Sequence, residues 1–600
     1  MPGLFGFFTL NSDNSASPEE CRKILTRLES PLRHQDFYGI DHWICPRGTS
    51  AIGRIGHKNL ILSAPEAVRD GALRFIYGCW QSPKGPDAAL HEGRGSFSGI
   101  QIDPEKGIFS LVVDRRASEP IFYRQLDDRI YFAPEVKALL AIDPNGGEID
   151  PAALASFLTA GHLFPHQTLH ARIRKLPSCH SLDAKGGQWD VKEYWRFIPG
   201  SVPGSGSVDE KADELGKLVQ ESVSASTDDL GTTMTFLSGG LDSRYILACL
   251  HRDRRFRNER CHAVTWGEKN NVRGSDPEVA QKVVASLGRV DHKFMPRLSD
   301  LFGEWFREVN YYLDGLSELA VFHPHEFQIM KTIREQGFEK VIRGDEAFGY
   351  LGRRYSTESA WATIGIRPFH RVRHLPNLLK PEWYNKLDEA NREDLAVLDR
   401  RFNGLDPTTL KDVIYFSQRV PTYLSQASYY KQIVLDQRNP LLSHELLDFY
   451  QTVPNSLRRH KNLFFRAFNR AFPTLGRIPY ATSGGLENWG ALMSGDTPLH
   501  HFMASEFQDS DSGIWDIIRQ DRALELFRSL GTPSGERPPH PLARKARSLA
   551  REAVDKVFPA RVDQMMMRRS QRRLPLPYLL LRILVLKDWH DRFFSGKAGT

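Results

Sequence analysis

LSGGLDSR, residues 237–244, places two glycines and two serines around one aspartate, directly after the apolar run MTF. A glycine-rich turn between a strand and a helix exposes backbone N–H groups at the start of the helix, where an anion is stabilised. Ser238 and Ser243 add hydroxyl donors, and Gly239 and Gly240 allow close approach of a phosphate. Asp242 would repel a bare phosphate, so we expect a Mg²⁺ ion between this carboxylate and the ligand. The stretch therefore predicts a nucleotide-phosphate site rather than a turn that only caps a helix.

The segments around this loop alternate between strand and helix patterns. TMTF at 233–236 predicts a strand before the loop, and SRYILACL at 243–250 predicts a helix after it. CHAVTW at 261–266 predicts a second strand, followed by a helix that opens with Asp276–Pro277, a cap residue before a proline. EKVIRG at 339–344 predicts a third strand. This alternation is typical of a parallel sheet with helices on both faces, so the region belongs to the α/β class.

The length of 600 residues predicts two or three domains. A linker rich in glycine, proline and serine covers residues 199–207, and short β-rich runs such as GIFSLVVD, PIFYRQ and RIYFAP precede it. Beyond about residue 360 the pattern is mainly helical. We therefore expect an N-terminal domain at 1–200, a nucleotide-binding domain at 208–490 and a helical extension at 491–600.

Charge and cysteine content narrow the class of protein. The net charge of +7 is concentrated at the end of the chain, where residues 541–600 hold 14 Lys/Arg against 5 Asp/Glu. Such a segment could meet an acidic peptide, nucleic acid or a membrane surface, but a solvated helical face is favoured, so no nucleic-acid partner is expected. The six cysteines form no CxxC pair, and no signal peptide or membrane span is evident. These features predict a cytoplasmic protein.

Several motifs resemble one known family in the order in which that family carries them. SGGLDS resembles the pyrophosphate-binding loop of the ATP pyrophosphatase superfamily, also called the PP-loop, and its surroundings resemble asparagine synthetase. The segment 311–354, with RGDEAFG, is similar to the family's second motif, and DQRNPLLSHELLDFYQTVPNSLRR is similar to a later one. Upstream, DRRASEPIFYRQLDDRIYFAPEVKALL resembles the family's amidotransferase domain. The resemblance extends from the first residues to about Tyr480.

This resemblance implies an N-terminal αββα amidotransferase-like domain and a C-terminal parallel-sheet PP-loop domain with a helical extension. The implied reaction transfers AMP from ATP, with Mg²⁺, to a carboxylate, and an amine then attacks the acyl-adenylate. By resemblance, Asp242 and Asp345 are the Mg²⁺ ligands. The implied nucleotide-binding residues are Leu237, Ser238, Gly239, Gly240, Asp242, Ser243, Thr265 and Gly344.

Three positions depart from the family pattern. Glutamine-dependent members begin Met-Cys-Gly, whereas this chain begins Met-Pro-Gly, and the proline at position 2 has no thiol to form a thioester. The glutamate expected before Asp345 is absent, and the lysine expected in an Arg-x-Lys context is replaced by Pro479. Lys461 is the substitute that we expect to contact the phosphate or the intermediate, alongside Asp345 as a catalytic residue. Glu346 is either a catalytic base or a carboxylate at the start of a helix.

Without a glutaminase the amine must come from the substrate itself, as in β-lactam synthetases and lasso-peptide cyclases. The compressed RGDEAFG motif and the basic C-terminal region favour a lasso-peptide macrolactam cyclase. Its partners would be a processed precursor peptide and a leader peptidase. An asparagine synthetase-like or β-lactam synthetase-like ligase on a small molecule remains the alternative, and a catalytically silent scaffold is a third hypothesis of a different class.

Overall fold

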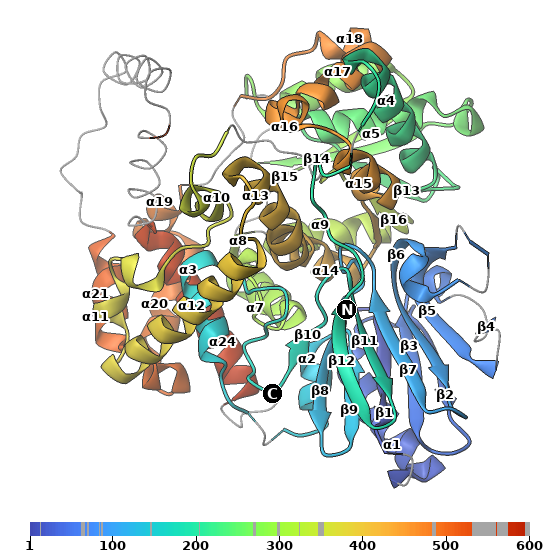
Figure 1. Cartoon of the computed structure of the whole chain (residues 1–600). Coiled ribbons are helices and arrows are strands. Elements are labelled where there is room, and N and C mark those ends of the chain that lie inside the picture. The colour runs from blue at the N-terminus through green and yellow to red at the C-terminus, as the bar shows by residue number, and fades with distance from the viewer. Residues whose placement is uncertain are drawn as a thin grey trace.

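The computed structural model describes most of the chain, which folds into two halves (Figure 1). The described residues are 1–11, 14–61, 66–68, 71–82, 84–85, 88–144, 147–202, 204–267, 270, 272–296, 301–322, 324–345, 353–482, 488–530, 560 and 574–594. Two antiparallel sheets form the N-terminal half, and one parallel sheet surrounded by helices forms the core of the second half. The predicted α/β fold class is confirmed.

Each N-terminal sheet has six strands. The first has the order β10-β8-β9-β1-β3-β2. Its strands are β1 (Gly3–Thr9), β2 (Gly39–Ile44), β3 (Ser50–Gly56), β8 (Phe122–Leu126), β9 (Arg129–Ala133) and β10 (Arg174–Lys175). The second has the order β12-β11-β7-β6-β5-β4. Its strands are β4 (Glu66–Ala67), β5 (Leu73–Gln81), β6 (Arg94–Asp103), β7 (Ile108–Val113), β11 (His180–Lys185) and β12 (Gln188–Glu193).

A buried apolar layer holds the two N-terminal sheets together. Phe8 of β1 stacks on Phe109 of β7 with ring centroids 3.9 Å apart, so the sheets pack face to face. Helices α1 (Pro18–Glu29) and α2 (Val136–Leu140) pack against the first sheet. The three β-rich runs noted in the sequence are β7, β8 and β9, so these strands were predicted correctly.

The parallel sheet has the order β15-β14-β13-β16-β17. Its strands are β13 (Thr233–Phe236), β14 (Cys261–Gly267), β15 (Val290–Pro296), β16 (Lys340–Ile342) and β17 (Asp436–Arg438), all paired in parallel. The three strands predicted from the sequence are confirmed as β13, β14 and β16. The two outer strands, β15 and β17, were not predicted.

Helices cover both faces of this sheet, as expected for a parallel sheet. One face packs on α4 (Val208–Ser224), α5 (Leu241–Arg252), α6 (Asp276–Leu287) and α17 (Asn462–Ala471). The other packs on α7 (Phe302–Leu313), α8 (Leu319–Phe322), α9 (Pro324–Glu335) and α14 (Gln426–Gln432). Because β13 is central and buried throughout, the loop that follows it opens at the middle of the sheet's carboxyl edge.

Most of the remaining described chain is helical, as predicted. The helices before β17 are α10 (Thr357–Ala362), α11 (Leu375–Leu378), α12 (Pro381–Arg401) and α13 (Pro407–Ile414). A π-helix, η8 (Tyr415–Leu424), connects α13 to α14. The later helices are α15 (His444–Gln451), α16 (Asn455–Arg458), α18 (Pro473–Gly476), α19 (Trp489–Ser494), α20 (Pro498–Gln508), α21 (Gln520–Ser529) and α24 (Leu576–Phe593). No helix in the described ranges is long and apolar enough to cross a bilayer.

Helix α24 joins segments that are far apart in the sequence. It contacts α3 (Pro151–Ala160) as well as α7, α20 and α21, and in Figure 1 it lies beside α3. Arg582 of α24 is buried and donates to Glu318 at 2.6 Å and to the Leu158 carbonyl at 2.9 Å. The expectation of a solvated basic face is therefore wrong for α24, because its cations are used in internal ion pairs.

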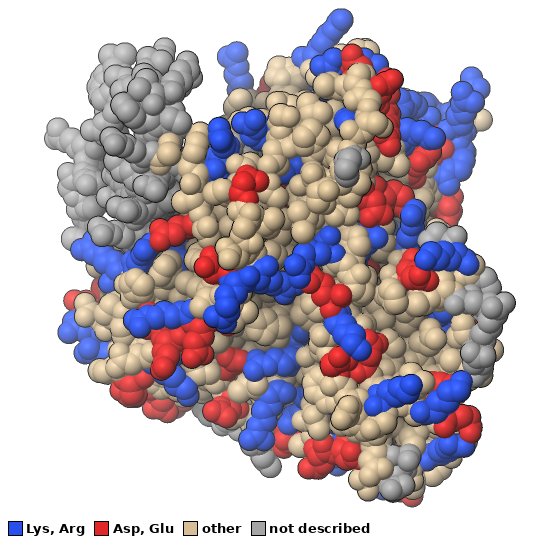
Figure 2. Space-filling model, viewed as in Figure 1, with Lys and Arg blue, Asp and Glu red and all other residues tan. Residues whose placement is uncertain are grey.

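Acidic and basic side chains are interspersed over the face of the molecule seen in Figure 2. No large area of one sign dominates this view among the residues that are coloured by charge. Most of the basic segment 541–600 lies outside the described residues, so the expectation for its surface stays a prediction.

Candidate functional site

The loop between β13 and α5 is held in shape by its own serines. Ser243 accepts a hydrogen bond from the Ser238 amide at 3.0 Å, and the two hydroxyls are also 3.0 Å apart. The Gly240 amide donates to the Ser238 hydroxyl at 3.2 Å. Gly240 is the N-cap of α5 and supplies no side chain, so within the described structure no side chain caps this helix. The first turn of α5 therefore presents its N–H groups for an anion.

Gly239 is required by close packing. A Cβ at this position would lie 2.5 Å from the Ala481 side chain and 3.1 Å from Val279, far inside normal contact. Its amide donates to the carboxylate of Asp276 at 2.7 Å. The sequence predicted Asp276 as the cap of α6, but Ser275 is the N-cap, because its hydroxyl accepts from the Glu278 amide. Asp276 instead fixes the backbone of the loop 237–244.

Arg244 locks the same loop to a distant segment. Its guanidinium is fully buried and donates to the carbonyls of Gly239, Leu475, Ile478 and Pro479 at 2.8–3.4 Å. The Tyr480 ring lies 4.4 Å from the guanidinium carbon, which is a cation–π contact. Sequence reasoning noted this arginine at the end of the loop but assigned it no role.

Asp242, in the first turn of α5, is paired with Lys461. The lysine Nζ lies 3.0 Å from each carboxylate oxygen. Burial raises the pKa of Asp242 above its usual value, although Lys461 opposes this, and the nearby Asp345 raises it further. The fold thus places Lys461, the residue chosen from the sequence, beside the loop.

The backbone at Lys461 is in an uncommon conformation. Lys461 has φ 57° and the preceding His460 has φ 54°, both in the left-handed region that non-glycine residues seldom occupy. Two consecutive residues of this kind cost free energy, and such strain is concentrated at functional sites. The strained turn forms the N-cap of α17 and directs the ammonium group toward α5.

Asp345 follows β16 and is held by two partners. Arg343 forms an ion pair with its carboxylate at 2.8 Å, and Asn439 bonds both its amide at 3.1 Å and its carboxylate at 3.3 Å. Gly344 lets this segment lie against α5, since a Cβ there would be 3.0 Å from the Asp242 side chain. The two acids come from adjacent strands and meet at one edge of the sheet.

Thr265 and Leu237 shape the loop from within. The Thr265 hydroxyl donates to the Leu237 carbonyl at 2.6 Å and lies 2.9 Å from His292 Nε2. Leu237 is buried, and its amide continues the ladder to β14 through the Val264 carbonyl at 2.9 Å. Both residues were expected to bind the nucleotide, and in this structure their polar groups bond to protein.

Two carboxylates beside a helix N-terminus fit a Mg²⁺–phosphate unit. Mg²⁺ in such sites takes one or two carboxylates and completes its octahedron with waters and phosphate oxygens. Asp242 and Asp345 supply the carboxylates, and the electrostatic cost of holding them together is what a cation would relieve. Within the described residues no cluster of three or more His, Cys, Asp or Glu side chains could hold an ion without other ligands. The donor set therefore suits a metal that arrives with phosphate.

A second buried pair lies behind Asp345 and was missed by sequence reasoning. Lys431 of α14 bonds to Glu326 of α9, both side chains are buried, and Tyr430 lies 3.4 Å from the same carboxylate. Burial lowers the pKa of Lys431, which Glu326 opposes. No sequence motif marks these positions. Glu346, the candidate base, lies outside the described residues.

The N-terminal domain has no thiol at the start of its first strand. Pro2 is buried, and a Cβ on Gly56 would lie 2.3 Å from it, so the proline ring is tightly packed. Five of the six cysteines are buried and none forms a disulfide. Burial raises the pKa of Cys249 to about 12 and that of Cys261 to about 11, so these thiols are not activated as nucleophiles.

Comparison with known proteins agrees with the two-part architecture. Residues 81–195 match a family model described as a glutamine amidotransferase domain, and residues 214–475 match one described as asparagine synthase. The glutamine-hydrolyzing asparagine synthetases 1 and 3 of Bacillus subtilis (strain 168) are 28% identical over 163 residues and 26% identical over 155 residues. These segments cover 27% and 26% of this chain and 25% of each relative, so the match spans about a quarter of the relatives' length.

Similarity to solved structures is weak. The allosteric regulatory enzyme of purine biosynthesis aligns at 11% identity with a TM-score of 0.24, covering 50% of this chain and 81% of that one. A TM-score this low carries no inference about fold. The sequence matches and the observed sheets are the stronger observations. We conclude that residues 214–475 are similar to asparagine synthase and that residues 81–195, which precede them, are similar to a glutamine amidotransferase domain.

Proposed function

We propose that this protein is an ATP-dependent amide ligase that forms AMP and pyrophosphate. The observation that carries the proposal is the meeting of Asp242, Asp345 and Lys461 at the uncapped N-terminus of α5. A helix N-terminus stabilises phosphate, and two acids beside it are useful only if a cation joins them to the ligand. The match of residues 214–475 to the asparagine synthase family model supports the same reaction class.

Each residue has a distinct part in this proposal. The α5 amides and the Ser238 hydroxyl bind the departing pyrophosphate. Asp242 and Asp345 would hold Mg²⁺, which would neutralise the charge that develops on the phosphates. Lys461, which pairs with Asp242 in this structure, would direct its ammonium group to the phosphates or the acyl-adenylate. Arg343 and Asn439 keep Asp345 oriented throughout.

The amine comes from the substrate itself. Pro2 stands where a glutamine-hydrolysing member has its nucleophilic cysteine, so we propose that glutamine is not consumed. A peptide whose N-terminal amine attacks an Asp or Glu side chain of the same molecule fits this requirement, which makes lasso-peptide macrolactam formation our preferred reaction. The precursor would be processed first by a leader peptidase. A small-molecule ligase is the alternative, supported by the same absence of a thiol.

Product analysis tests the reaction class. Purified protein, ATP, Mg²⁺ and a processed precursor peptide should yield AMP and pyrophosphate in a one-to-one ratio with ring closure. The Asp242→Asn variant is the matched control and should yield little of either product. ADP and phosphate as the main products would overturn the proposal.

A glutaminase assay tests the amine source. Release of ammonia from glutamine should stay at background both for the protein as it is and for the Pro2→Cys variant, since a thiol alone does not rebuild a glutamine pocket. Ammonia release well above background by the unaltered protein would contradict glutamine independence.

A further inference from the structure

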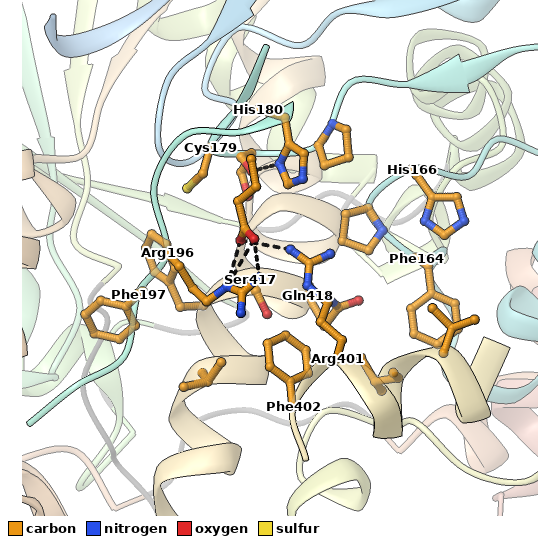
Figure 3. A pocket seen from close by; sticks show the side chains of 18 of the residues that line it. Phe164, His166, Cys179, His180, Arg196, Phe197, Arg401, Phe402, Ser417 and Gln418 are labelled. Atoms are coloured by element: carbon orange, nitrogen blue, oxygen red, sulfur yellow. Dashed lines mark hydrogen bonds and ion pairs between the residues drawn. The ribbon is translucent and has the colours of Figure 1, made fainter. Parts of the chain in front are cut away.

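A separate cavity lies where the N-terminal domain meets the helices between β16 and β17 (Figure 3). Its walls come from the ends of β11 and β12 on one side and from α12, α13 and η8 on the other, and its volume is about 90 Å³. None of the residues of the loop 237–244 lines it. Nothing in the proposed ligase reaction uses this cavity.

Two polar side chains on the π-helix point to a ligand. Gln418 is 5% exposed and its Oε1 is buried without a hydrogen-bond partner among the described residues. The neighbouring Ser417 hydroxyl is in the same situation, and both residues line the cavity (Figure 3). An unpaired buried acceptor costs about 1–3 kcal/mol, and π-helical turns are frequent at functional sites. The site therefore has an acceptor in need of an N–H or O–H donor.

Two guanidinium groups at the cavity share a single carboxylate. Glu193 accepts from Arg196 Nε at 3.0 and 3.1 Å and from Arg401 at 2.9 Å, so one carboxylate serves two guanidinium groups (Figure 3). Burial alone would raise the pKa of Glu193, but these hydrogen bonds outweigh it and the pKa lies below its usual value. The trio thus carries one surplus positive charge at neutral pH.

Among the described residues that line the cavity, Asp394 carries the one carboxyl group besides Glu193, and it is still mostly ionised at neutral pH. Asp394 accepts from the Gln167 amide at 2.7 Å, and burial raises the pKa of Asp394 to about 6. It therefore holds its negative charge less firmly at neutral pH than an exposed aspartate does, and the charge it keeps is engaged by Gln167.

Part of the remaining wall is apolar, and His166, Ser178 and His180 also line it. Phe402 and Phe416 are buried and face the cavity beside Leu398, with Trp195 packed edge-on against Phe416 at 5.9 Å between ring centroids. A cavity of about 90 Å³ is smaller than the ~150 Å³ apolar cavity that holds a benzene ring, so it suits a short branched aliphatic side chain better than an aromatic one.

We propose that this cavity binds an aliphatic amino acid with a free carboxylate, either the free amino acid or the C-terminal residue of a peptide. The carboxylate pairs with Arg196 and Arg401, the nitrogen donates to Gln418 Oε1, and the side chain fills the space beside Phe402 and Phe416. The three features of the wall match the three parts of one such residue.

Calorimetric titration of the full chain, without ATP, tests the site with two probes that differ only in charge. N-acetyl-L-leucine should bind, and N-acetyl-L-leucinamide should bind at least about tenfold more weakly, because it lacks the charge-assisted hydrogen bonds. Equal binding of the two probes, or no binding of the acid, would overturn the proposal.

Variants connect the binding to the named residues. Arg401→Gln should weaken binding of the acid about tenfold, whereas Arg400→Gln, one position away and outside the cavity wall, should leave it unchanged. Gln418→Met keeps the shape of the side chain, removes the acceptor and should weaken both probes. Circular dichroism and melting curves check that each variant folds. Unchanged binding in folded Arg401→Gln and Gln418→Met proteins would refute the assignment.

Two further arms separate the sources of the ligand. Free L-leucine binding more tightly than Gly-Gly-Gly-Leu supports a free amino acid, and the reverse order, lost on amidation of the peptide, supports a peptide C-terminus. Because these titrations need no ATP and no catalysis, their outcome is independent of whether the ligase proposal holds.

Discussion

The ammonium nitrogen of Lys461 lies 3.0 Å from both carboxylate oxygens of Asp242, although the two residues are 219 positions apart. This bond joins the first turn of α5 to a strained left-handed turn at the start of α17. Phosphates are expected at this site. The ammonium group could then exchange Asp242 for a phosphate oxygen, and the freed carboxylate could bind a cation of the nucleotide.

Removing the ammonium group should therefore reduce catalysis. Lys461→Met should lower AMP formation by roughly 10²–10³-fold, the usual effect of losing one preorganised stabilising group. Lys461→Arg keeps the charge and should retain more activity. Lys282→Met, an exposed lysine on α6, is the matched control and should behave as the wild type. Full turnover in Lys461→Met would remove this residue from the site.

Asp242 and Asp345 should act as one unit. Asp242→Asn and Asp345→Asn should each lower turnover by roughly two to four orders of magnitude, and the double variant should be little worse than either, because groups that hold one metal are not additive. A double-mutant cycle on the rate of AMP formation measures this. Fully additive losses would mean that the two carboxylates work independently.

Arg244 should matter for both stability and nucleotide binding. Arg244→Met leaves four buried or partly buried carbonyls without their donor and should lower the free energy of unfolding by about 3 kcal/mol. The loop would also lose its fixed contact with residues 475–481, so KM for ATP should rise. Arg252→Met at the exposed end of α5 is the control. Denaturant titration and steady-state kinetics check the two effects, and a stable variant with normal KM would contradict them.

Stability should depend on pH through Lys175. Its buried Nζ donates to the Pro421 carbonyl at 2.8 Å and to the Tyr429 hydroxyl at 3.2 Å, and burial lowers the pKa of Lys175 to about 7. Between about pH 7 and the usual lysine pKa of 10.5, the unfolded chain binds one proton more than the folded protein. The free energy of unfolding should therefore rise with pH in this window, and the destabilising charge is fully present below about pH 7.

The measurement is the difference between the wild type and Lys175→Met in urea unfolding at pH 7, 8.5 and 10. As the pH rises, the wild type should gain stability relative to Lys175→Met. The exposed Lys192→Met variant should show no such trend. A flat difference for Lys175 would show that its amine titrates like a free lysine.

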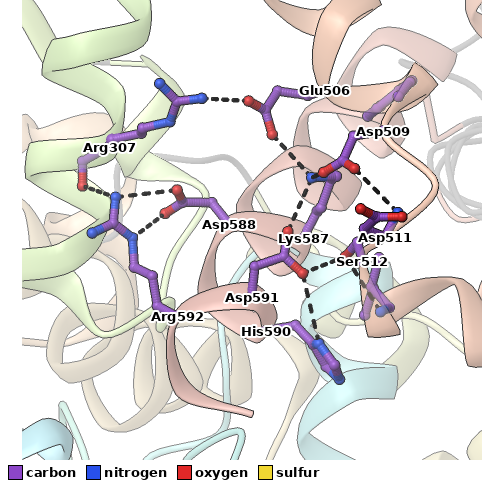
Figure 4. Close-up of polar contacts among 12 residues, drawn as sticks. Arg307, Glu506, Asp509, Asp511, Ser512, Lys587, Asp588, His590, Asp591 and Arg592 are labelled. Carbon is purple, nitrogen blue, oxygen red and sulfur yellow. Dashed lines mark hydrogen bonds and ion pairs between the residues drawn. The ribbon is translucent and has the colours of Figure 1, made fainter. Parts of the chain in front are cut away.

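Lys587 should be a main anchor of α24 (Figure 4). Its buried Nζ contacts Glu506, Asp509 and Asp591 at 2.8–3.1 Å. Burial alone would lower the pKa of Lys587, but the three carboxylates hold it above its usual value. Lys587→Met should lower the free energy of unfolding by about 3 kcal/mol, because it removes the buried cation that these three acids share. Lys380→Met removes a more exposed pair and should cost less than about 1 kcal/mol. Equal melting temperatures for the two variants would refute this difference.

The centre of the fold was predictable from the sequence because its signals are local. The apolar run of β13, the glycine-rich turn and the apolar stripe of α5 all lie within twenty residues. β17 gave no such signal, since it is three polar residues long, and its burial depends on an ion pair between Asp436 and Arg438. A hydrophobic pattern cannot report a strand whose buried groups are charged.

In the site, too, features with a local sequence signal could be predicted and features made by distant contacts could not. The acids Asp242 and Asp345 follow predicted strands, so their meeting could be foreseen from the topology of a parallel sheet. Three of the four carbonyls that accept from Arg244 lie more than 200 residues downstream, and a backbone carbonyl is the same in every residue type. Asp276 had the pattern of a helix cap, and only the folded geometry shows its bond to Gly239.

The packing of α24 against α3 has a consequence for synthesis. Phe157 and Leu158 of α3 share one apolar core with Leu579, Ile583 and Trp589, and more than 400 residues separate the two helices. At ~5–20 residues per second, the ribosome needs roughly 20 to 80 s to make that interval. During this time the apolar residues of α3 lack the cover that α24 provides, and transiently exposed apolar surface of this kind is what chaperones protect on nascent chains.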